Sequence, residues 1–123
     1  MGVKSPELMA QAFADRFNAK DIKGFCELYA EDAIFTYDGA ETAIGRAQIE
    51  SALAGFMMAG LHFRGESVGV LVYGDTALTR FKWEMLDAQG GAVSSGVSAE
   101  VQRCGADGLW RLIIDDTGGG SRK

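Results

Sequence analysis

The sequence predicts an α+β fold, in which three N-terminal helices pack on one face of a curved antiparallel sheet. Apolar residues recur with helical spacing through the first sixty residues, and with a spacing of two from residue 68 onward. A run of helices followed by a run of strands is typical of α+β domains. The 123 residues, 47% hydrophobic and 24% charged, fit one globular domain over residues 1–117 with a Gly-rich, charged tail at 118–123.

The three helices follow from capping residues and apolar spacing. The first begins after Ser5 and Pro6, because a proline is tolerated at the first helical position. Its buried face is predicted by apolar residues at every fourth position: Met9, Phe13 and Phe17. A second helix begins at Asp21, whose carboxylate can cap it, and has an apolar side made of Ile22, Phe25, Cys26 and Tyr29. A third ends at Gly60 and carries an apolar stripe: Ile49, Ala52, Leu53, Phe56 and Met57.

The strands follow from alternation and from glycine turns. Ala33–Tyr37 is predicted as a short strand, followed by a loop that contains Gly39 and Gly45. The second half then forms a four-stranded meander with strands near residues 68–73, 77–85, 93–104 and 109–116. In the second of these strands the charged residues share the even positions, which predicts one face in water.

Charge and cysteine content exclude several classes of function. Twelve basic and seventeen acidic residues give a net charge of −5, which disfavours a nucleic acid partner. The longest apolar run, Leu53–Leu61, is too short to cross a bilayer, and the N-terminus lacks an apolar signal core, so we expect a cytoplasmic protein. Cys26 and Cys104 match no metal or redox spacing, and we expect both to be reduced thiols.

One histidine, His62, excludes a His-rich metal site, and we expect no metal and no cofactor. It lies where the third helix leads into the first long strand. There it either lies at a pocket mouth, where an imidazole suits general-base chemistry, or is a solvent-exposed loop residue.

Two pairs of polar neighbours end strands, and adjacent strand residues point to opposite faces. One of Asp115 and Asp116 should therefore face the helices, where desolvation would raise the pKa of its carboxyl group into a useful range. The alternative is that both are solvated strand-end charges. Of Tyr37 and Asp38 only one can face inward, and Tyr37 is either a hydroxyl donor in an apolar pocket or a plain core residue.

Several segments of the chain resemble the nuclear transport factor 2-like superfamily, which includes ketosteroid isomerase, scytalone dehydratase and the SnoaL-like polyketide cyclases. The segments are 18–21, 28–33, 45–49, 95–103, 107–111 and 114–116, and the resemblance extends over residues 7–117. Its C-terminal half is similar to small SnoaL-like bacterial proteins. The resemblance implies a cone, with a strongly bent sheet around the helices, an apolar pocket at the open end, and dimerisation through the sheet.

The catalytic residues of these relatives do not carry over as a set. At the three isomerase positions the chain has Phe13, Ala99 and Tyr37. Of the dehydratase dyad it keeps His62, but Asn18 takes the place of the aspartate. The same alignment turns two residues of the last strand inward, Ile113 and Asp115, and three outward: Trp110, Leu112 and Ile114.

Two main hypotheses result. In the first, the chain is a cofactor-free isomerase, dehydratase or cyclase that acts on a small apolar carbonyl compound, with Asp115 as base, Tyr37 as oxyanion donor and His62 as a second donor or base. The ligand would contact six residues: Phe13, Phe17, Phe56, Trp83, Ala99 and Ile113. In the second, a non-catalytic homodimer binds a small apolar ligand. A pure association domain, its cavity filled by its own aromatic side chains, is a weaker third reading.

Overall fold

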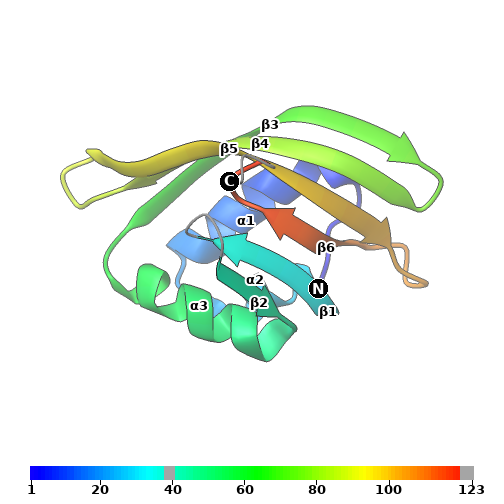
Figure 1. Cartoon of the computed structure of the whole chain (residues 1–123), viewed down its shortest axis with the longest axis horizontal. Coiled ribbons are helices and arrows are strands. Elements are labelled where there is room, and N and C mark those ends of the chain that lie inside the picture. Colours follow the sequence, from blue (N-terminus) through cyan, green and yellow to red (C-terminus); the bar gives the residue numbers. More distant parts are fainter. Residues whose placement is uncertain (38–40, 120–123) are drawn as a thin grey trace.

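A bent six-stranded sheet wraps around the helices in the computed structural model, which describes residues 1–37 and 41–119 (Figure 1). The helical elements are a 3₁₀ turn η1 (Pro6–Leu8), α1 (Met9–Asn18), α2 (Ile22–Cys26) and α3 (Arg46–Met58). The strands are β1 (Tyr29–Tyr37), β2 (Glu41–Ile44), β3 (His62–Tyr73), β4 (Thr76–Leu86), β5 (Ala92–Cys104) and β6 (Trp110–Asp116), in the sheet order β2-β1-β6-β5-β4-β3. The α+β class and the four-stranded meander are confirmed.

The sheet differs from the prediction at its N-terminal end. β2 forms in the segment that was expected to be a loop, because four residues are too few to show an alternating pattern. β1 begins at Tyr29, a residue assigned from the sequence to the second helix, which instead ends at Cys26. The last strand inserts between β1 and β5 and pairs with β1 in parallel, so the sheet is mixed rather than wholly antiparallel.

The helices fill the concave side of the sheet. The predicted inner face of α1 is confirmed, since Met9, Phe13 and Phe17 are all buried. The Phe13 ring lies 4.5 Å from that of Phe25 on α2 and 4.8 Å from that of Phe63 on β3, centroid to centroid. Asp21 caps α2 by accepting a 3.0 Å hydrogen bond from the backbone N–H of Gly24. The aromatic cluster of Phe13, Phe25 and Phe63 connects α1 and α2 to the sheet.

A β-bulge in β6 decides which residues of the last strand face the core. Val101 of β5 pairs with Ile114, but the next β5 residue pairs with Leu112, so Ile113 has no partner in the ladder. An extra residue reverses the alternation. Leu112 and Asp115 are therefore both buried although an odd number of positions separates them. The expectation that Trp110 and Leu112 point outward is wrong, because both lie on the core side before the bulge.

The convex face of the sheet carries a row of apolar side chains that crosses all six strands. Each member is paired in register with the next, in the order Leu71, Leu78, Val101, Ile114, Ile34 and Ile44. Apart from the half-buried valine, these side chains are 38–69% exposed. The outer apolar face expected from the sequence therefore exists, but mostly different residues build it.

The predictions on Asp38 and on residues 120–123 of the tail lie outside the described residues. Among the described helices, none has the length and hydropathy needed to span a membrane.

Candidate functional site

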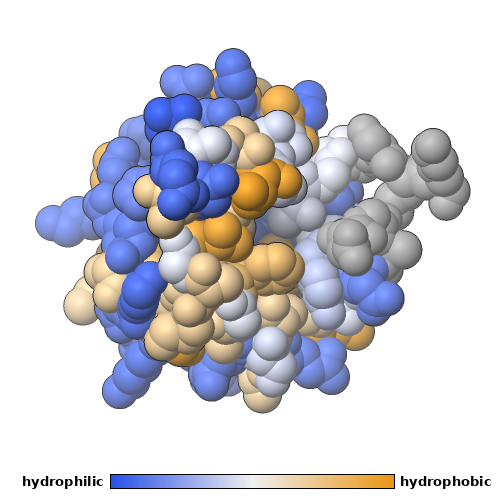
Figure 2. All heavy atoms as spheres, turned by 90° about the vertical axis from the view of Figure 1, so that its left-hand side faces the viewer, coloured by the Kyte–Doolittle hydropathy of each residue, from blue (hydrophilic) through white to orange (hydrophobic). Residues whose placement is uncertain are grey.

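A cavity of about 500 Å³ lies between the concave face of the sheet, α1 and α3. Its wall is mostly apolar, and four of the residues predicted to contact a ligand line it: Phe13, Phe17, Phe56 and Trp83. The α3–β3 connection and the β4–β5 hairpin lie on the left-hand side of the molecule in Figure 1. Seen from that side, apolar side chains gather around a hollow (Figure 2). A cavity therefore remains despite the many aromatic residues.

Trp83 forms a flat part of the wall because its neighbours leave room for it. In the sheet it pairs with two glycines, Gly65 on β3 and Gly96 on β5. A Cβ atom at Gly96 would lie 3.2 Å from the indole ring. The indole stacks on Phe63, with ring centroids 6.4 Å apart, and its Nε1–H donates a 3.2 Å hydrogen bond to the carbonyl oxygen of Thr117. These contacts hold the ring in one orientation.

Asp115 is the one carboxyl group among the described residues that line this cavity. It is only 4% exposed, and its Oδ2 accepts a 2.6 Å hydrogen bond from the hydroxyl of Tyr29. Burial raises the pKa of Asp115 to about 7, against the lowering effect of the Tyr29 hydrogen bond. Such a group can both take up and release a proton near neutral pH.

A second carboxyl group, Glu100, lies behind this wall. It pairs with Asp115 in register across β5 and β6, and both residues are on the concave face. Burial, and then the charge of Asp115, raise the pKa of Glu100 to about 8, although hydrogen bonds with Ser98 and Thr79 oppose the rise. The two carboxyl groups thus disfavour a doubly ionised state and titrate as a pair.

Tyr29 supports this pair from β1. Burial and the nearby Asp115 raise the pKa of its phenol well above the ordinary value, so it stays a hydrogen-bond donor. Tyr29 and Glu100 were both missed in the sequence analysis. Tyr29 was read as part of a helix face. Glu100 belongs to a polar alternating set (Ser98, Glu100 and Gln102) that a rule of apolar residues inside would turn toward water. Because the apolar residues of this strand build the convex face instead, the side chains that such a rule would turn toward water are the ones that face the core.

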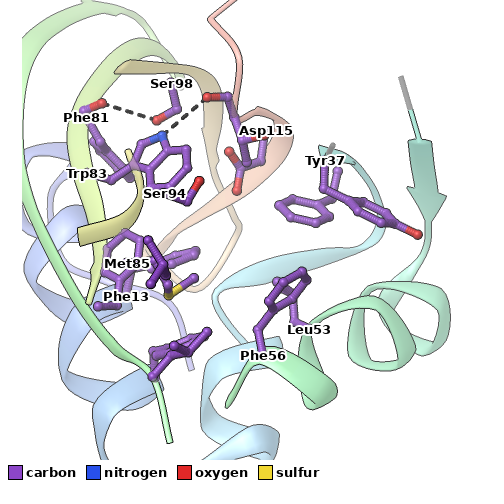
Figure 3. A pocket seen from close by; sticks show the side chains of 16 residues that line it. Phe13, Tyr37, Leu53, Phe56, Phe81, Trp83, Met85, Ser94, Ser98 and Asp115 are labelled. Carbon is purple, nitrogen blue, oxygen red and sulfur yellow. Dashed lines mark hydrogen bonds between the residues drawn. The ribbon is translucent and has the colours of Figure 1, made fainter. Parts of the chain in front are cut away.

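Tyr37 lines the cavity with its ring, which stacks on Phe35 at a centroid distance of 5.5 Å. Its hydroxyl points away from Asp115, toward α3 and β2 (Figure 3). The structure thus brings the ring of Tyr37 to the cavity but not the hydroxyl that was expected to hold an oxyanion.

His62 does not join the site. It is exposed and precedes the inward-facing Phe63 on β3, so alternation turns its side chain to the other face. Asn18 lies 3.3 Å from His62 Nε2, but it also accepts a 2.7 Å hydrogen bond from the N–H of Phe63 and donates one of 2.8 Å to the carbonyl oxygen of Phe63. Asn18 therefore fastens the end of α1 to β3. The solvent-exposed alternative for His62 is the one that the structure favours.

Ala99 and Ile113 are not among the residues that line the cavity. Ala99 is paired with Arg80 and Asp116 and shares the convex face with them, one position from the inward Glu100. Ile113 is the unpaired residue of the bulge. The expectation that these two contact a ligand is therefore corrected. In each strand, the side chain that faces inward belongs to a neighbouring residue: Glu100 in β5 and Leu112 in β6. Within residues 1–37 and 41–119, no group of three or more His, Cys, Asp or Glu side chains is placed to hold a metal ion.

Solved structures share this fold at low sequence identity. A nuclear transport factor 2-like protein with a cystatin-like fold from Novosphingobium aromaticivorans superposes with a TM-score of 0.78 at 23% identity, covering 89% of this chain and 75% of that one. A proposed dehydratase of the same superfamily from Streptomyces avermitilis gives 0.71 at 22% identity, covering 88% of each chain. A proposed calcium/calmodulin-dependent protein kinase type II association domain from Thiobacillus denitrificans gives 0.78 at 17% identity, covering 94% of this chain and 95% of that one.

The search of curated proteins found no match. The model of the SnoaL-like domain family, in contrast, matches residues 10–113, which include α1 except its first residue, α2, α3, β1 to β5 and most of β6. This match agrees with the bent sheet and with the neighbours of known structure. The chain belongs to the SnoaL-like domain family.

Proposed function

We propose that the protein is a cofactor-independent enzyme that moves a proton on a small, largely apolar carbonyl compound. The observation that carries the proposal is Asp115, a nearly fully buried carboxyl group with a raised pKa in the wall of an apolar cavity. A general base works best when its pKa lies near the operating pH. The cavity volume of about 500 Å³ falls in the range of small-molecule sites.

In this reaction the carboxylate of Asp115 takes a proton from the carbon next to the carbonyl group. The C–H bond breaks, an O–H bond forms on Asp115, and the electron pair moves onto the carbonyl oxygen as an enolate. In a β,γ-unsaturated ketone, return of the proton from Asp115 to the γ-carbon shifts the double bond and completes an isomerisation. In a β-hydroxy ketone, the enolate expels the β-hydroxyl group, which takes the proton from Asp115 and leaves as water, and this completes a dehydration. The name of the Streptomyces avermitilis neighbour supports the second outcome only through the shared fold.

Exchange of α-protons for deuterium tests the proposal without knowledge of the substrate. A panel of cyclic and aromatic ketones is incubated with the protein in D₂O, and exchange is followed by proton NMR. We expect catalysed exchange for at least one ketone, and a loss of about two orders of magnitude or more in Asp115→Asn. The matched control is Asp116→Asn, which changes the neighbouring carboxylate on the other face of the strand and should retain exchange.

The second candidate function is a non-catalytic protein that binds a small apolar ligand. It is favoured by the nearly continuous apolar wall and by the outward direction of the Tyr37 hydroxyl. A ligand that raises the melting temperature of the wild type and of Asp115→Asn equally, with no ketone exchanged by either, would support this function and contradict the enzyme.

We also infer that two copies associate through the convex face of the sheet. The exposed apolar row across all six strands is a surface of the kind that monomers rarely leave uncovered. An interface of this kind is self-complementary, as a two-fold dimer requires. The description of the Thiobacillus denitrificans neighbour as an association domain supports it.

Cys26 and Cys104 are both free thiols, which supports the expected cytoplasmic location.

A further inference from the structure

A chain of buried hydrogen bonds leads from the N-terminal turn to the cavity wall. Gln102 Nε2 lies 3.2 Å from the carbonyl oxygen of Pro6 and 3.1 Å from Thr79 Oγ1. Thr79 Oγ1 lies 3.0 Å from Glu100 Oε1, and Glu100 Oε2 is hydrogen-bonded to the hydroxyl of Ser98. Of these residues Ser98 is the one that lines the cavity.

The direction of this chain can be followed from its buried end. A carbonyl oxygen only accepts, so the atom next to Pro6 must be the amide nitrogen of Gln102, which then also donates to Thr79. Thr79 has a single hydroxyl proton, and having accepted from Gln102 it donates that proton to Glu100 Oε1. The other oxygen of Glu100 is left to interact with Ser98.

The protonation of Glu100 decides what Ser98 does. Glu100 is completely buried, it pairs with Asp115, and none of the ion pairs in the described part of the chain includes it. The charge of Arg80 favours the ionised form of Glu100, but less than burial and Asp115 disfavour it. A buried carboxyl group with no paired cation and a second carboxyl group beside it stays neutral. The neutral acid donates its proton to Ser98 Oγ, so the hydroxyl of Ser98 must donate elsewhere.

The alternative acceptor for the Ser98 hydroxyl is weak. The carbonyl oxygen of Phe81 lies 3.5 Å from Ser98 Oγ, beyond the usual O–H···O distance of about 2.5–3.0 Å. Ser98 and Asp115 lie at the same end of the cavity in Figure 3. A ligand oxygen placed there would accept the Ser98 proton while a neighbouring carbon faces the carboxylate.

We propose that Ser98 is the oxyanion-binding donor of the site and that Glu100, acting as a neutral acid through Ser98, is the residue that positions its hydroxyl proton toward the ligand. The proposal rests on the function proposed above and adds to it the recognition of a carbonyl oxygen. It replaces Tyr37, whose hydroxyl points away from Asp115, in that role.

The test uses acetophenone labelled with ¹³C at its carbonyl carbon, and ethylbenzene as a hydrocarbon of the same shape. The ketone can only accept a hydrogen bond. Infrared difference spectra of the complex give the carbonyl stretching frequency, and titration gives the affinity of each compound. In the wild type we expect the stretching frequency to be lower than in hexane. We expect Ser98→Ala to return it toward the hexane value and to weaken acetophenone binding about tenfold, with ethylbenzene binding unchanged.

Three variants separate the parts of the argument. Ser94→Ala makes the same chemical change in the same cavity and should keep the wild-type frequency. Glu100→Gln should also keep it, because an amide N–H can donate to Ser98 as a neutral acid does. Glu100→Met should behave like Ser98→Ala. Where circular dichroism shows that Glu100→Met is unfolded, the comparison of Glu100→Gln with Ser98→Ala decides.

The outcomes distinguish the two proposals. A frequency unchanged in Ser98→Ala overturns Ser98 as the donor. A lowered frequency that is absent from the wild type and appears in Glu100→Gln overturns the neutral acid, since it would show an ionised Glu100 that accepts the proton of Ser98. In either case, deuterium exchange that depends on Asp115 would still support the proposed function. If neither acetophenone nor ethylbenzene bound to the wild type, the ligand cavity itself, and with it both proposals, would be contradicted.

Discussion

The hydroxyl of Tyr29 donates a 2.6 Å hydrogen bond to Oδ2 of Asp115, which joins two buried side chains 86 positions apart in the sequence. Tyr29 lies at the start of β1 and Asp115 near the end of β6, and the parallel pairing of these strands brings them together. The bond leaves the other carboxylate oxygen for the cavity. It also partly offsets the cost of burying Asp115, because it lowers a pKa that desolvation raises.

Tyr29→Phe should therefore destabilise the fold and raise the pKa of the proposed base, Asp115. Loss of the hydroxyl leaves Asp115 with a missing partner, at a cost of about 1–3 kcal/mol in the free energy of unfolding. The pKa of Asp115 should rise further, so ketone exchange should need a higher pH. Urea denaturation and the pH profile of exchange measure the two effects. Tyr73→Phe is the control, since this tyrosine is 88% exposed, and an equal effect of both substitutions would contradict the role of Tyr29.

Stability should fall as the pH rises from about 5 to about 8. The folded-state pKa values of Asp115 and Glu100 lie above their ordinary values, so the folded protein holds these protons more tightly than the unfolded chain. Their contribution is complete at low pH and is lost as the pH passes through about 7 and about 8. Asp107, whose pKa the Arg111 side chain lowers to about 2, titrates below this range.

The expected loss is a few kcal/mol, since one pKa unit corresponds to about 1.4 kcal/mol. Urea denaturation at several pH values gives the slope. Glu100→Gln should flatten it, whereas Glu84→Gln, which changes a carboxylate on the outer face that pairs with Arg64, should not. A slope that Glu100→Gln leaves unaltered would show that Glu100 does not titrate in this range.

Gly96→Ala should push Trp83 into the cavity. The new methyl group would lie 3.2 Å from the indole, closer than such contacts normally allow. We expect a cost of about 1–3 kcal/mol in stability, a shift in tryptophan fluorescence and weaker ethylbenzene binding. Gly55→Ala on α3 adds the same methyl group where no atom lies within 4 Å. If it altered binding as much, the effect could not be assigned to Trp83.

Leu78→Lys should convert the proposed dimer into a monomer. Leu78 is 50% exposed near one end of the apolar row, and a two-fold interface would bury the new charge without a partner. Sedimentation velocity measures the mass of each form. Met58→Lys, at a 59% exposed position on α3 outside the row, should leave the mass unchanged. A wild type that sediments as a monomer at all concentrations would disprove the interface.

Local patterns were enough to predict the α+β class, the inner face of α1 and the meander of strands. These features depend on residues close in sequence: apolar spacing along a helix, alternation along a strand, and glycines at turns. Alternation alone left open which of Asp115 and Asp116 faces inward, and the family resemblance favoured Asp115, which the structure buries in the cavity wall together with the four expected aromatic residues. Neither placed Glu100, because a buried acid in a strand looks like a solvent-facing one until its neighbours are known.

The sequence by itself determined the fold class, the family and the apolar residues available to line a cavity, because each of these is encoded in short-range pattern. Only the tertiary structure decided which polar groups meet there. The bulge at Ile113 reverses the alternation of β6, the pairing of β5 with β6 sets Glu100 beside Asp115, and the parallel pairing with β1 brings in Tyr29. Side-chain direction in a strand changes with a single residue of register, and register is set by contacts between strands that lie far apart in the chain.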